Sequence, residues 1–286
     1  MPTTADSGAV RRSVVSLLRA AGCVFAEDEA ELLISAAATP ADLDTMVAER
    51  VAGEPLEHVL GWAEFCGLRI AVEPGVFIPR RRTEFLAQQA VALIAAKAGG
   101  PAVVVDLCCG SGAVGVALGE AEKRVELHAA DIDPVAVRCA RRNLAALGGR
   151  VYEGDLYAPL PATLRGRVDL LIANAPYVPT DEIALMPPEA RIHEPRVALD
   201  GGADGLDIVR RVAAAAPDWL APGGHLVIET SERQAAHAVA AATRSGLLAR
   251  VASSDELSAT VLIASWPQPS FHDGARQQHH GDEGAE

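Results

Sequence analysis

No apolar run in this 286-residue sequence approaches the ~18 residues that mark a membrane-spanning helix. The first residues, Met1 to Asp6, lack the basic flank and apolar stretch of a secretory signal. There are only five cysteines, an odd number, and neither a disulfide framework nor the spacing of a metal site is present. We therefore expect a protein outside the membrane, without a bound metal, in the reducing cytoplasm.

Positive charge is also scarce. The sequence has 25 Lys and Arg against 38 Asp and Glu, a net charge of -13. This balance disfavours broad attraction to phosphate backbones, so a protein is the favoured partner and a nucleic acid is a disfavoured substrate. The run Arg80-Arg81-Arg82 is a local exception. It can grip a phosphate or an acidic stretch of a partner, or form a solvated turn, and the sequence leaves these readings open.

Half of the residues are apolar, and the length suggests one large domain with a smaller one. Apolar spacing predicts helices from about Ala9 to Arg50, with a new start at Thr39-Pro40. Leu68–Val72 and Val76–Pro79 predict a β-hairpin. From residue 103 onward strands alternate with helices, which implies an open, mostly parallel, doubly wound α/β sheet. The predicted strands are 103–106, 125–130, 150–152, 168–173, 225–228, 248–252 and 260–264, and the predicted helices are 83–97, 113–119, 134–147, 206–220 and 234–245.

A glycine-containing loop, Asp106 to Gly115, joins the first of these strands to its helix. Glycines let the backbone approach a ligand closely, and the helix start supplies unpaired N–H donors. Asp131 ends the next strand, 21 positions after Gly110, where a carboxylate can accept both ribose hydroxyls of an adenosine. Asp133 is the better helix N-cap, because Pro134 then takes the first helical position. These residues predict a nucleoside-containing cofactor, either a dinucleotide or S-adenosylmethionine.

Asp155 follows the third strand, where the adenine amino group of such a cofactor would need an acceptor. A turn aspartate explains the same residue equally well. The sequence leaves both interpretations of Asp155 open.

The fourth strand runs directly into Asn174-Ala175-Pro176-Tyr177. An amide nitrogen is a poor nucleophile, so it must be held in line with a methyl sulfonium and its developing charge must be stabilised. The side-chain oxygen of Asn174 and the carbonyl of Ala175 can accept its two N–H bonds. Pro176 fixes the turn and Tyr177 can cover the planar amide. An Asn-x-Pro turn is common after strands, but together with the glycine loop it indicates amide methylation from S-adenosylmethionine.

With these motifs in order from about Ala9 to Trp266, the sequence resembles the release-factor glutamine N5-methyltransferase family. The resemblance also rests on Gly61 to Leu68, Pro74 to Arg80, Thr83-Glu84, Glu194 to Leu199 and Gly201 to Asp207. It implies a small helical substrate-recognition domain (1–60), a β-hairpin linker (61–82) and a seven-stranded methyltransferase domain (83–266), followed by a tail (267–286) that we expect to be disordered. It implies a cofactor site of Cys108, Cys109, Gly110, Ser111, Gly112, Asp131, Asp155, Leu156 and Asn174, and a catalytic set of Asn174, Ala175, Pro176 and Tyr177.

The sequence departs from the family pattern at three places near this site. Ala175 stands where the family has a proline. Alanine still offers the backbone carbonyl that the substrate amide would need, but the loop becomes less rigid. Cys108-Cys109 replace Gly-Thr, and a proline is missing after Arg80. These changes suggest a divergent paralogue. The resemblance therefore supports the family's methylation chemistry for this protein more strongly than it supports a release factor as the substrate.

Two rival functions remain at this stage. The first is an adenine-N6 methyltransferase of DNA or RNA, because the exocyclic amine of adenine offers the same two N–H bonds to an Asn-x-Pro-Tyr turn. The acidic sequence and the lack of a basic domain argue against this function. A nonenzymatic adaptor is disfavoured by the retained Asn174, Pro176, Tyr177 and Asp131. The acidic residues of the second helical stretch can be a recognition platform or a solvated face; they are Glu27, Asp28, Glu29 and Glu31.

Overall fold

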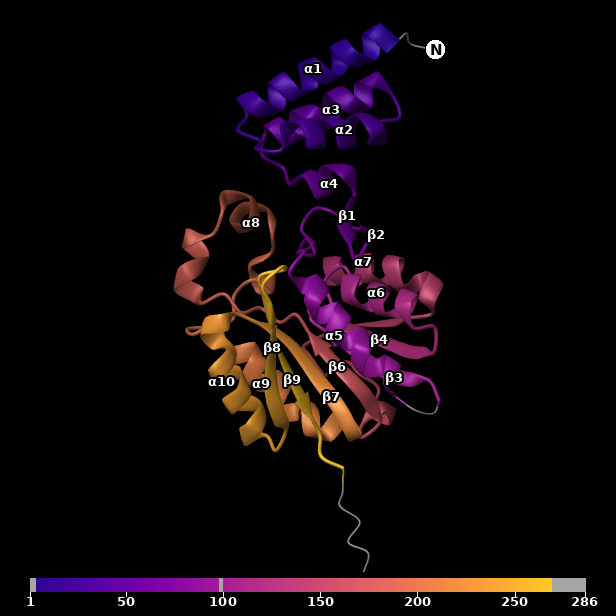
Figure 1. Ribbon diagram of the computed structural model, residues 1–286, viewed down its shortest axis with the longest axis vertical. Coiled ribbons are helices and arrows are strands. Elements are labelled where there is room, and N and C mark those ends of the chain that lie inside the picture. The colour runs from indigo at the N-terminus through magenta and orange to yellow at the C-terminus, as the bar shows by residue number, and fades with distance from the viewer. Residues whose placement is uncertain (1–3, 98–99, 269–286) are drawn as a thin grey trace, which may run out of the picture.

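The computed structural model describes residues 4–97 and 100–268, so nearly all of the expected tail lies outside the described residues. A helical N-terminal domain stands on a larger α/β domain, and a short hairpin lies between them (Figure 1). The α/β domain is built on a seven-stranded sheet in the order β5-β4-β3-β6-β7-β9-β8. The first five of these strands run parallel, and β9 is antiparallel to both of its neighbours. The predicted seven-stranded, doubly wound fold is confirmed.

The bounds of the strands follow the apolar runs of the sequence. Every residue of β3 is buried, as a parallel strand covered on both faces requires. The strands are β3 (Ala102–Leu107), β4 (Val125–Asp131), β5 (Arg150–Glu153), β6 (Val168–Ala173), β7 (Leu220–Thr230), β8 (Leu248–Ser254) and β9 (Ala259–Ser265). β7 begins five residues earlier than predicted, because Leu220 already pairs with Val168 of β6. The strand then passes through Pro222-Gly223-Gly224, where its register against β6 shifts.

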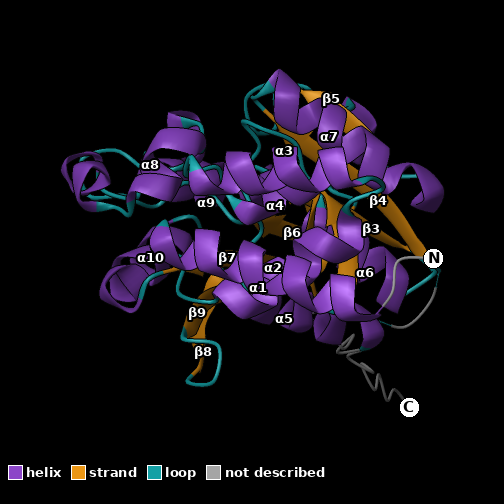
Figure 2. Ribbon diagram, turned by 90° about the horizontal axis from the view of Figure 1, so that it is seen from above, coloured by secondary structure: helices purple, strands orange, loops and turns teal. Residues whose placement is uncertain are grey.

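Helices cover both faces of the sheet, as Figures 1 and 2 show. α5 (Thr83–Ala95), α6 (Ala113–Ala121) and α7 (Pro134–Leu144) pack on one face. α9 (Asp207–Trp219) and α10 (Glu232–Arg244) pack on the other. Asp133 caps α7 by accepting from the amide of Val135 at 2.8 Å, with Pro134 at the first position, which confirms the predicted cap.

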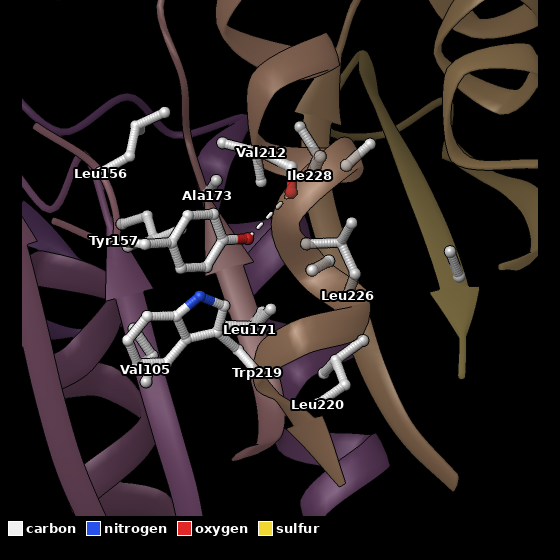
Figure 3. Close-up of a cluster of buried hydrophobic side chains, with 14 of the residues drawn as sticks. Val105, Leu156, Tyr157, Leu171, Ala173, Val212, Trp219, Leu220, Leu226 and Ile228 are labelled. Carbon is white, nitrogen blue, oxygen red and sulfur yellow. Dashed lines mark hydrogen bonds between the residues drawn. The ribbon is translucent and has the colours of Figure 1, made fainter. Parts of the chain in front are cut away.

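The face under α9 and α10 holds the cluster drawn in Figure 3. Tyr157 and Trp219 stack there with ring centroids 5.4 Å apart. The Tyr157 hydroxyl donates to the carbonyl of Val212 at 2.9 Å, so its polar end is satisfied inside the core. Because Tyr157 comes next to Leu156 in the chain, shortly after β5 ends at Glu153, this packing anchors the Asp155–Leu156 segment at the carboxyl end of the sheet.

Four helices form the N-terminal domain: α1 (Thr4–Ala20), α2 (Ala26–Ala36), α3 (Pro40–Val51) and α4 (Leu56–Leu60). Thr39 and Asp42 form a capping box at the start of α3, as the helix break predicted. Leu18 and Leu33 are fully buried in its separate core. Three of the four acidic residues singled out in the sequence are paired within this domain: Glu27 with Arg19, Glu29 with Arg50, and Glu31 with Arg11.

The predicted hairpin is wrong in its pairing. The structure pairs β2 (Leu68–Ala71) with the preceding β1 (Trp62–Phe65), and residues 76–79 form no strand. The two turn residues, Cys66 and Gly67, both have positive φ, at 52° and 72°, which is the geometry of a two-residue hairpin turn. The amide of Ile78 instead donates to the Glu194 carboxylate, which takes this segment toward the site.

Candidate active site

A cavity opens at the carboxyl ends of β3, β4 and β6, next to the point where the strand order reverses. Ligands of open α/β sheets bind at this place. The cavity brings together nearly all the site residues predicted from the sequence: Cys108, Cys109, Gly110, Ser111, Asp131, Asp155, Leu156, Asn174, Ala175, Pro176 and Tyr177. Gly112 is the exception. It is the N-cap residue of α6 and packs toward α7, where an added Cβ would be 3.3 Å from Ala140 and Leu144.

The loop after β3 is shaped by three left-handed residues, Cys108, Gly110 and Gly112, with φ of 54°, 55° and 78°. Asp131 holds this loop against β4, because one carboxylate oxygen accepts from the amide of Gly110 at 2.8 Å. The other oxygen accepts from the amide of Asp133 at 2.9 Å. Asp131 therefore fixes the position of the loop and also lines the cavity.

Two further carboxylates complete the acidic side of the cavity. Asp155 accepts from Arg211 at 2.6 Å. Asp106, the last but one residue of β3, was not predicted as a site residue from the sequence, although it is the first residue of the glycine-containing segment. It is 2 % exposed, and its Oδ2 has no hydrogen-bond partner among the described residues. Burial raises the pKa of Asp106 to about 7, with a further contribution from the charge of Asp131.

Asn174 follows β6 and turns its side chain between the cavity and α5. Its Nδ2 donates to the hydroxyl of Thr83 at 3.3 Å. Its Oδ1 accepts no hydrogen bond from any residue in the described part of the chain, so this oxygen is available to a donor in the cavity. The end of β6 thus carries an acceptor without a partner among the described residues, and its role in binding an amide stays a prediction.

Tyr177, at the other end of the turn, is fixed by three neighbours. Its hydroxyl donates to Glu229 at 3.1 Å, and its carbonyl accepts from Gln234 at 2.9 Å. The guanidinium of Arg82 lies over the ring, 5.7 Å from the centroid. Burial, followed by the charge of Glu229, raises the pKa of Tyr177, so this tyrosine is a neutral donor.

Two glycines support the turn from behind. A Cβ on Gly201 would lie 2.7 Å from the carbonyl oxygen of Pro176, and one on Gly205 would lie 2.2 Å from that of Tyr177. The amide of Gly201 also donates to the carbonyl of Val178 at 2.9 Å. The backbone of residues 199–206 therefore cradles the Asn174–Tyr177 turn at distances that only glycine permits.

Comparison with known proteins agrees with this geometry. Residues 67–202 match the methyltransferase small domain family. The release factor glutamine methyltransferase of Geobacter sulfurreducens is 40% identical over 203 residues, which cover 70% of this chain and 69% of that protein. The chain belongs to the release factor glutamine methyltransferase family. A Streptomyces pristinaespiralis protein named 4-amino-L-phenylalanine/4-methylamino-L-phenylalanine methyltransferase is 36% identical, covering 69% of this chain and 72% of its own.

Among solved structures, a methyltransferase from Pyrococcus furiosus has the same fold. It is 16% identical, with a TM-score of 0.53, and the match covers 71% of this chain and 90% of that one. The likeness concerns the fold alone. The family membership comes from the sequence relatives, and it makes this chain an S-adenosylmethionine-dependent methyltransferase.

The charge of the cavity fits this cofactor better than a dinucleotide. Its wall carries Asp106, Asp131, Asp133 and Asp155, and each of its three arginines is paired with a carboxylate. A pyrophosphate would meet these acids with like charge, whereas S-adenosylmethionine brings a sulfonium and an ammonium group. The lining residues that could hold it are the loop Cys108–Ser111, Asp131, Asp155 and Leu156, together with Asp106, which the structure adds to the residues predicted from the sequence.

The three arginines of the family's hairpin segment have different environments. Arg80 pairs with Glu194 at 2.5 Å, and Arg82 lies 3.4 Å from Glu229, so both are committed to carboxylates of this chain. Arg81 is exposed. Arg81 and Arg82 form an exposed turn before α5, which agrees with the reading as a solvated turn, and 49% of the Arg82 side chain is exposed. The reading as a grip on a partner stays a prediction.

The Arg80–Glu194 pair joins the hairpin segment to the stretch that follows α8 (Pro188–His193) and lines the cavity with Pro195 and Leu199. Only 1% of the Glu194 side chain is exposed, and its Oε2 has no partner among the described residues. Arg80→Ala would leave this carboxylate buried without a cation, so we expect a loss of about 1–3 kcal/mol that opens the segment locally. Hydrogen exchange should become faster in residues 188–199.

The control for this prediction is the adjacent exposed arginine. Arg81→Ala should leave exchange in residues 188–199 unchanged, and Glu194→Gln combined with Arg80→Ala should restore part of the protection, because the buried charge is gone. Unchanged exchange in Arg80→Ala would show that the pair does not hold this wall.

Neither a membrane span nor a metal centre is found in residues 4–97 and 100–268. No helix there is long and apolar enough to cross a membrane. No group of three or more His, Cys, Asp or Glu side chains could hold a metal ion in the same residues. Cys108 and Cys109 line the cavity as free thiols, and burial raises the pKa of both.

Proposed function

We propose that this enzyme transfers a methyl group from S-adenosylmethionine to the side-chain amide nitrogen of a glutamine in a peptide chain release factor. The observation that carries the proposal is the orientation of Asn174. Its NH2 end is bound to Thr83, its oxygen has no partner among the described residues, and the residue lines the cavity beside the loop after β3. An oxygen acceptor at this place suits an acceptor substrate that carries N–H bonds, and relatives covering most of this chain are named for release factors.

The residues of the turn have distinct tasks in this reaction. Bound S-adenosylmethionine supplies a methyl carbon made electrophilic by its sulfonium. Asn174 Oδ1 and the Ala175 carbonyl accept the two amide N–H bonds, which directs the nitrogen lone pair at that carbon and stabilises the positive charge that develops. The N–C bond forms as the S–C bond breaks, and the nitrogen then loses one proton to water. No strong base is required, because the methylated nitrogen is acidic.

The turn is well supported although Ala175 stands where the family has a proline. Ala175 is 1% exposed and packs in the core cluster under α9, and Pro176 is also buried. Burial therefore limits the flexibility that the missing ring would allow. This supports retention of the family's chemistry despite the departure.

We further propose that residues 1–60 recognise the protein substrate, that residues 61–82 link them to the catalytic domain of residues 83–266, and that the enzyme acts in the cytoplasm. Val24 and Phe25, between α1 and α2, are 83% and 67% exposed, which suits a contact with a protein. Arg50 binds Glu189 at 3.0 Å, which connects this domain to α8, the helix that precedes the lining residues Pro195 and Val197. The five free thiols suit a reducing compartment.

The direct test uses purified release factor and S-adenosylmethionine with a tritiated methyl group. Label should appear in the release factor, should be removed by protease and survive nuclease, and should map by mass spectrometry to one glutamine. Label on nucleic acid would establish the adenine-N6 alternative. Label only on free 4-amino-L-phenylalanine, the substrate named for one relative, would also overturn the proposal.

Cofactor binding should depend on pH through Asp106. A cationic ligand favours the ionised form of Asp106. Because the pKa of Asp106 is about 7, binding below this pH must be accompanied by release of the proton from Asp106. Affinity should therefore rise with pH, by about tenfold from pH 5.5 to 7, a range in which an α-amino group stays charged. Titration calorimetry measures both the affinity and the released proton. Asp106→Asn should flatten the dependence, and a flat wild-type profile would exclude this role.

A further inference from the structure

The helix α7 carries an exposed cluster of positive charge in a protein whose net charge is -13. Arg138, Arg141 and Arg142 are all exposed, and their spacing of three and four residues places them next to one another on the helix surface. The helix runs from Pro134 to Leu144 and contains no acidic residue. We call these three residues the arginine face of α7.

The arginine face differs from most cations of the protein in its lack of carboxylate partners. Most of the other lysines and arginines that the structure describes are paired with Asp or Glu. None of the three residues of the face forms an ion pair within residues 4–97 and 100–268. Arg138 donates to the carbonyl of Pro134 at 3.2 Å, and Arg141 donates to that of Val151 at 3.2 Å. A guanidinium has five N–H donors, so both side chains keep donors for a ligand.

A fourth arginine extends this positive surface onto the neighbouring hairpin, which lies directly above α7 in Figure 1. The side chain of Asn143 in α7 accepts from the amide of Ala71 at 3.0 Å and donates to its carbonyl at 2.8 Å, which joins α7 to β2. Arg69, two residues earlier on β2, is exposed and has no carboxylate partner among the described residues. Its guanidinium lies over the ring of Trp62, 4.2 Å from the centroid, and this contact restricts its orientation.

The stability of the helix explains only part of the cluster. Arg141 and Arg142 lie in the last turn of α7, where positive charge interacts favourably with the helix dipole. Arg138 lies in the second turn and has no such role. Like charges four residues apart, as in Arg138 and Arg142, destabilise a helix by about 0.2–0.5 kcal/mol. Exposed positive charge that is unfavourable in the free protein is typical of a surface that binds an anionic partner.

The arginine face also lies close to the active site. Asp133 and Ala136, at the start of α7, line the cavity. At a rise of about 1.5 Å per residue, Arg138 lies about 3 Å and Arg142 about 9 Å further along the helix axis than Ala136. A protein interface of ordinary size covers roughly 800 Å² on each partner, so a protein whose side chain enters the cavity reaches the face as well.

We propose that the arginine face of α7, together with Arg69, binds an acidic segment of the protein substrate while the target glutamine occupies the cavity. The inference rests on the proposed function, because the partner is the protein that supplies this glutamine. A protein fits better than a nucleic acid, since the phosphates that flank a base in the cavity would lie close to its acidic wall. A protein can place its acidic side chains only at the arginines, while a neutral amide enters the cavity.

The test neutralises part of the face and compares two substrates. Arg138→Gln combined with Arg142→Gln removes two charges at nearly unchanged helix propensity. We expect the KM for the release factor to rise about tenfold, with kcat and the KM for S-adenosylmethionine within about twofold, because the face acts in association and not in methyl transfer. A pentapeptide with the target glutamine at its centre, uncharged neighbours and blocked termini should be methylated equally well by the wild type and this variant.

A second pair of arginines controls for the change in net charge. Arg244 and Arg250 are exposed and form no ion pair in the described part of the chain. They lie on α10 and β8, at the edge of the sheet opposite to β5. Arg244→Gln combined with Arg250→Gln changes the net charge by the same amount. This control should leave the KM for the release factor within about twofold of the wild type, because it leaves the face intact.

A binding measurement without methyl transfer separates the inference from the proposed function. Fluorescein-labelled poly-L-glutamate should bind the wild type at low KCl concentration and about tenfold more weakly the variant with Arg138→Gln and Arg142→Gln, as measured by fluorescence anisotropy. High KCl concentration should remove the difference, because salt screens exposed charges. If the proposed function fails, the wild type does not methylate the release factor, but the binding of poly-L-glutamate still reports on the face.

The inference is overturned if the variant of the face keeps the wild-type KM for the release factor, or if the control pair raises this KM as much. Equal binding of poly-L-glutamate to the wild type and the variant would also overturn it. Tighter binding of polyuridylate than of poly-L-glutamate would assign the face to a nucleic acid. Self-association of the wild type that the variant loses, measured by sedimentation, would assign the face to a second copy of this acidic chain. Either assignment would replace the one proposed.

Discussion

Replacing Asn174 by alanine should lower methyl transfer by about 10³-fold while leaving S-adenosylmethionine affinity within a few-fold. The unpartnered side-chain oxygen is lost, and with it the proposed stabilisation of charge on the attacking nitrogen. The cofactor loop does not depend on this side chain, because Asp131 holds it through the amide of Gly110. Single-turnover transfer to the release factor measures the first effect, and calorimetry measures the second.

Asp131→Ala provides the complementary result. It should mainly weaken cofactor binding, because it removes both the expected ribose acceptor and the anchor of the loop. Transfer at saturating cofactor should be retained in large part. If Asn174→Ala kept wild-type turnover, or lost cofactor affinity as Asp131→Ala does, the acceptor role of Asn174 would be wrong.

The parts of the site that the sequence predicts are those formed by neighbours in the chain. The loop after β3 and the Asn174–Tyr177 turn each follow directly from a buried apolar strand. Strands that are buried on both faces have a pattern that is easily recognised. Because parallel strands end at the same edge of the sheet, the order of strands and helices alone brings these two segments together.

The parts that the sequence does not predict depend on contacts between distant segments. Thr83 meets Asn174 across 91 positions, and Tyr177 meets Glu229 across 52. A glutamate at the end of a strand suggests a solvated edge, and only the packing of α5 and the turn over β7 shows that Glu229 is buried. The hairpin was mispaired for a related reason, since Val76–Pro79 has an extended pattern but its Ile78 amide is bound to Glu194 from another segment.

Gly205 lies in the distant segment that packs against the Asn174–Tyr177 turn. Its replacement by alanine should lower kcat by about 10²-fold. Its φ is +74°, and the new Cβ would lie 2.2 Å from the Tyr177 carbonyl oxygen and 2.3 Å from the Gln234 side chain. Neither can move alone, because Gln234 already donates to the carbonyls of Tyr177 and Asp204. The clash must displace the turn, and a shift of about 1 Å at reacting groups can cost about 10²-fold in rate.

Gly166→Ala is the matched control for the strain of this substitution. Gly166 has a φ of +69°, close to that of Gly205, but an added Cβ would meet nothing within 4 Å. Both variants should lose the roughly 1–2 kcal/mol that a left-handed alanine costs, which lowers Tm, and Gly205→Ala should lose more, because its clash adds to this strain. Only Gly205→Ala should lose kcat, with S-adenosylmethionine affinity retained, because only there does the new methyl group push on the segment that holds Asn174. Equal losses of kcat in the two variants would mean that the rate follows stability, and the turn would then not need the close support of residues 199–206.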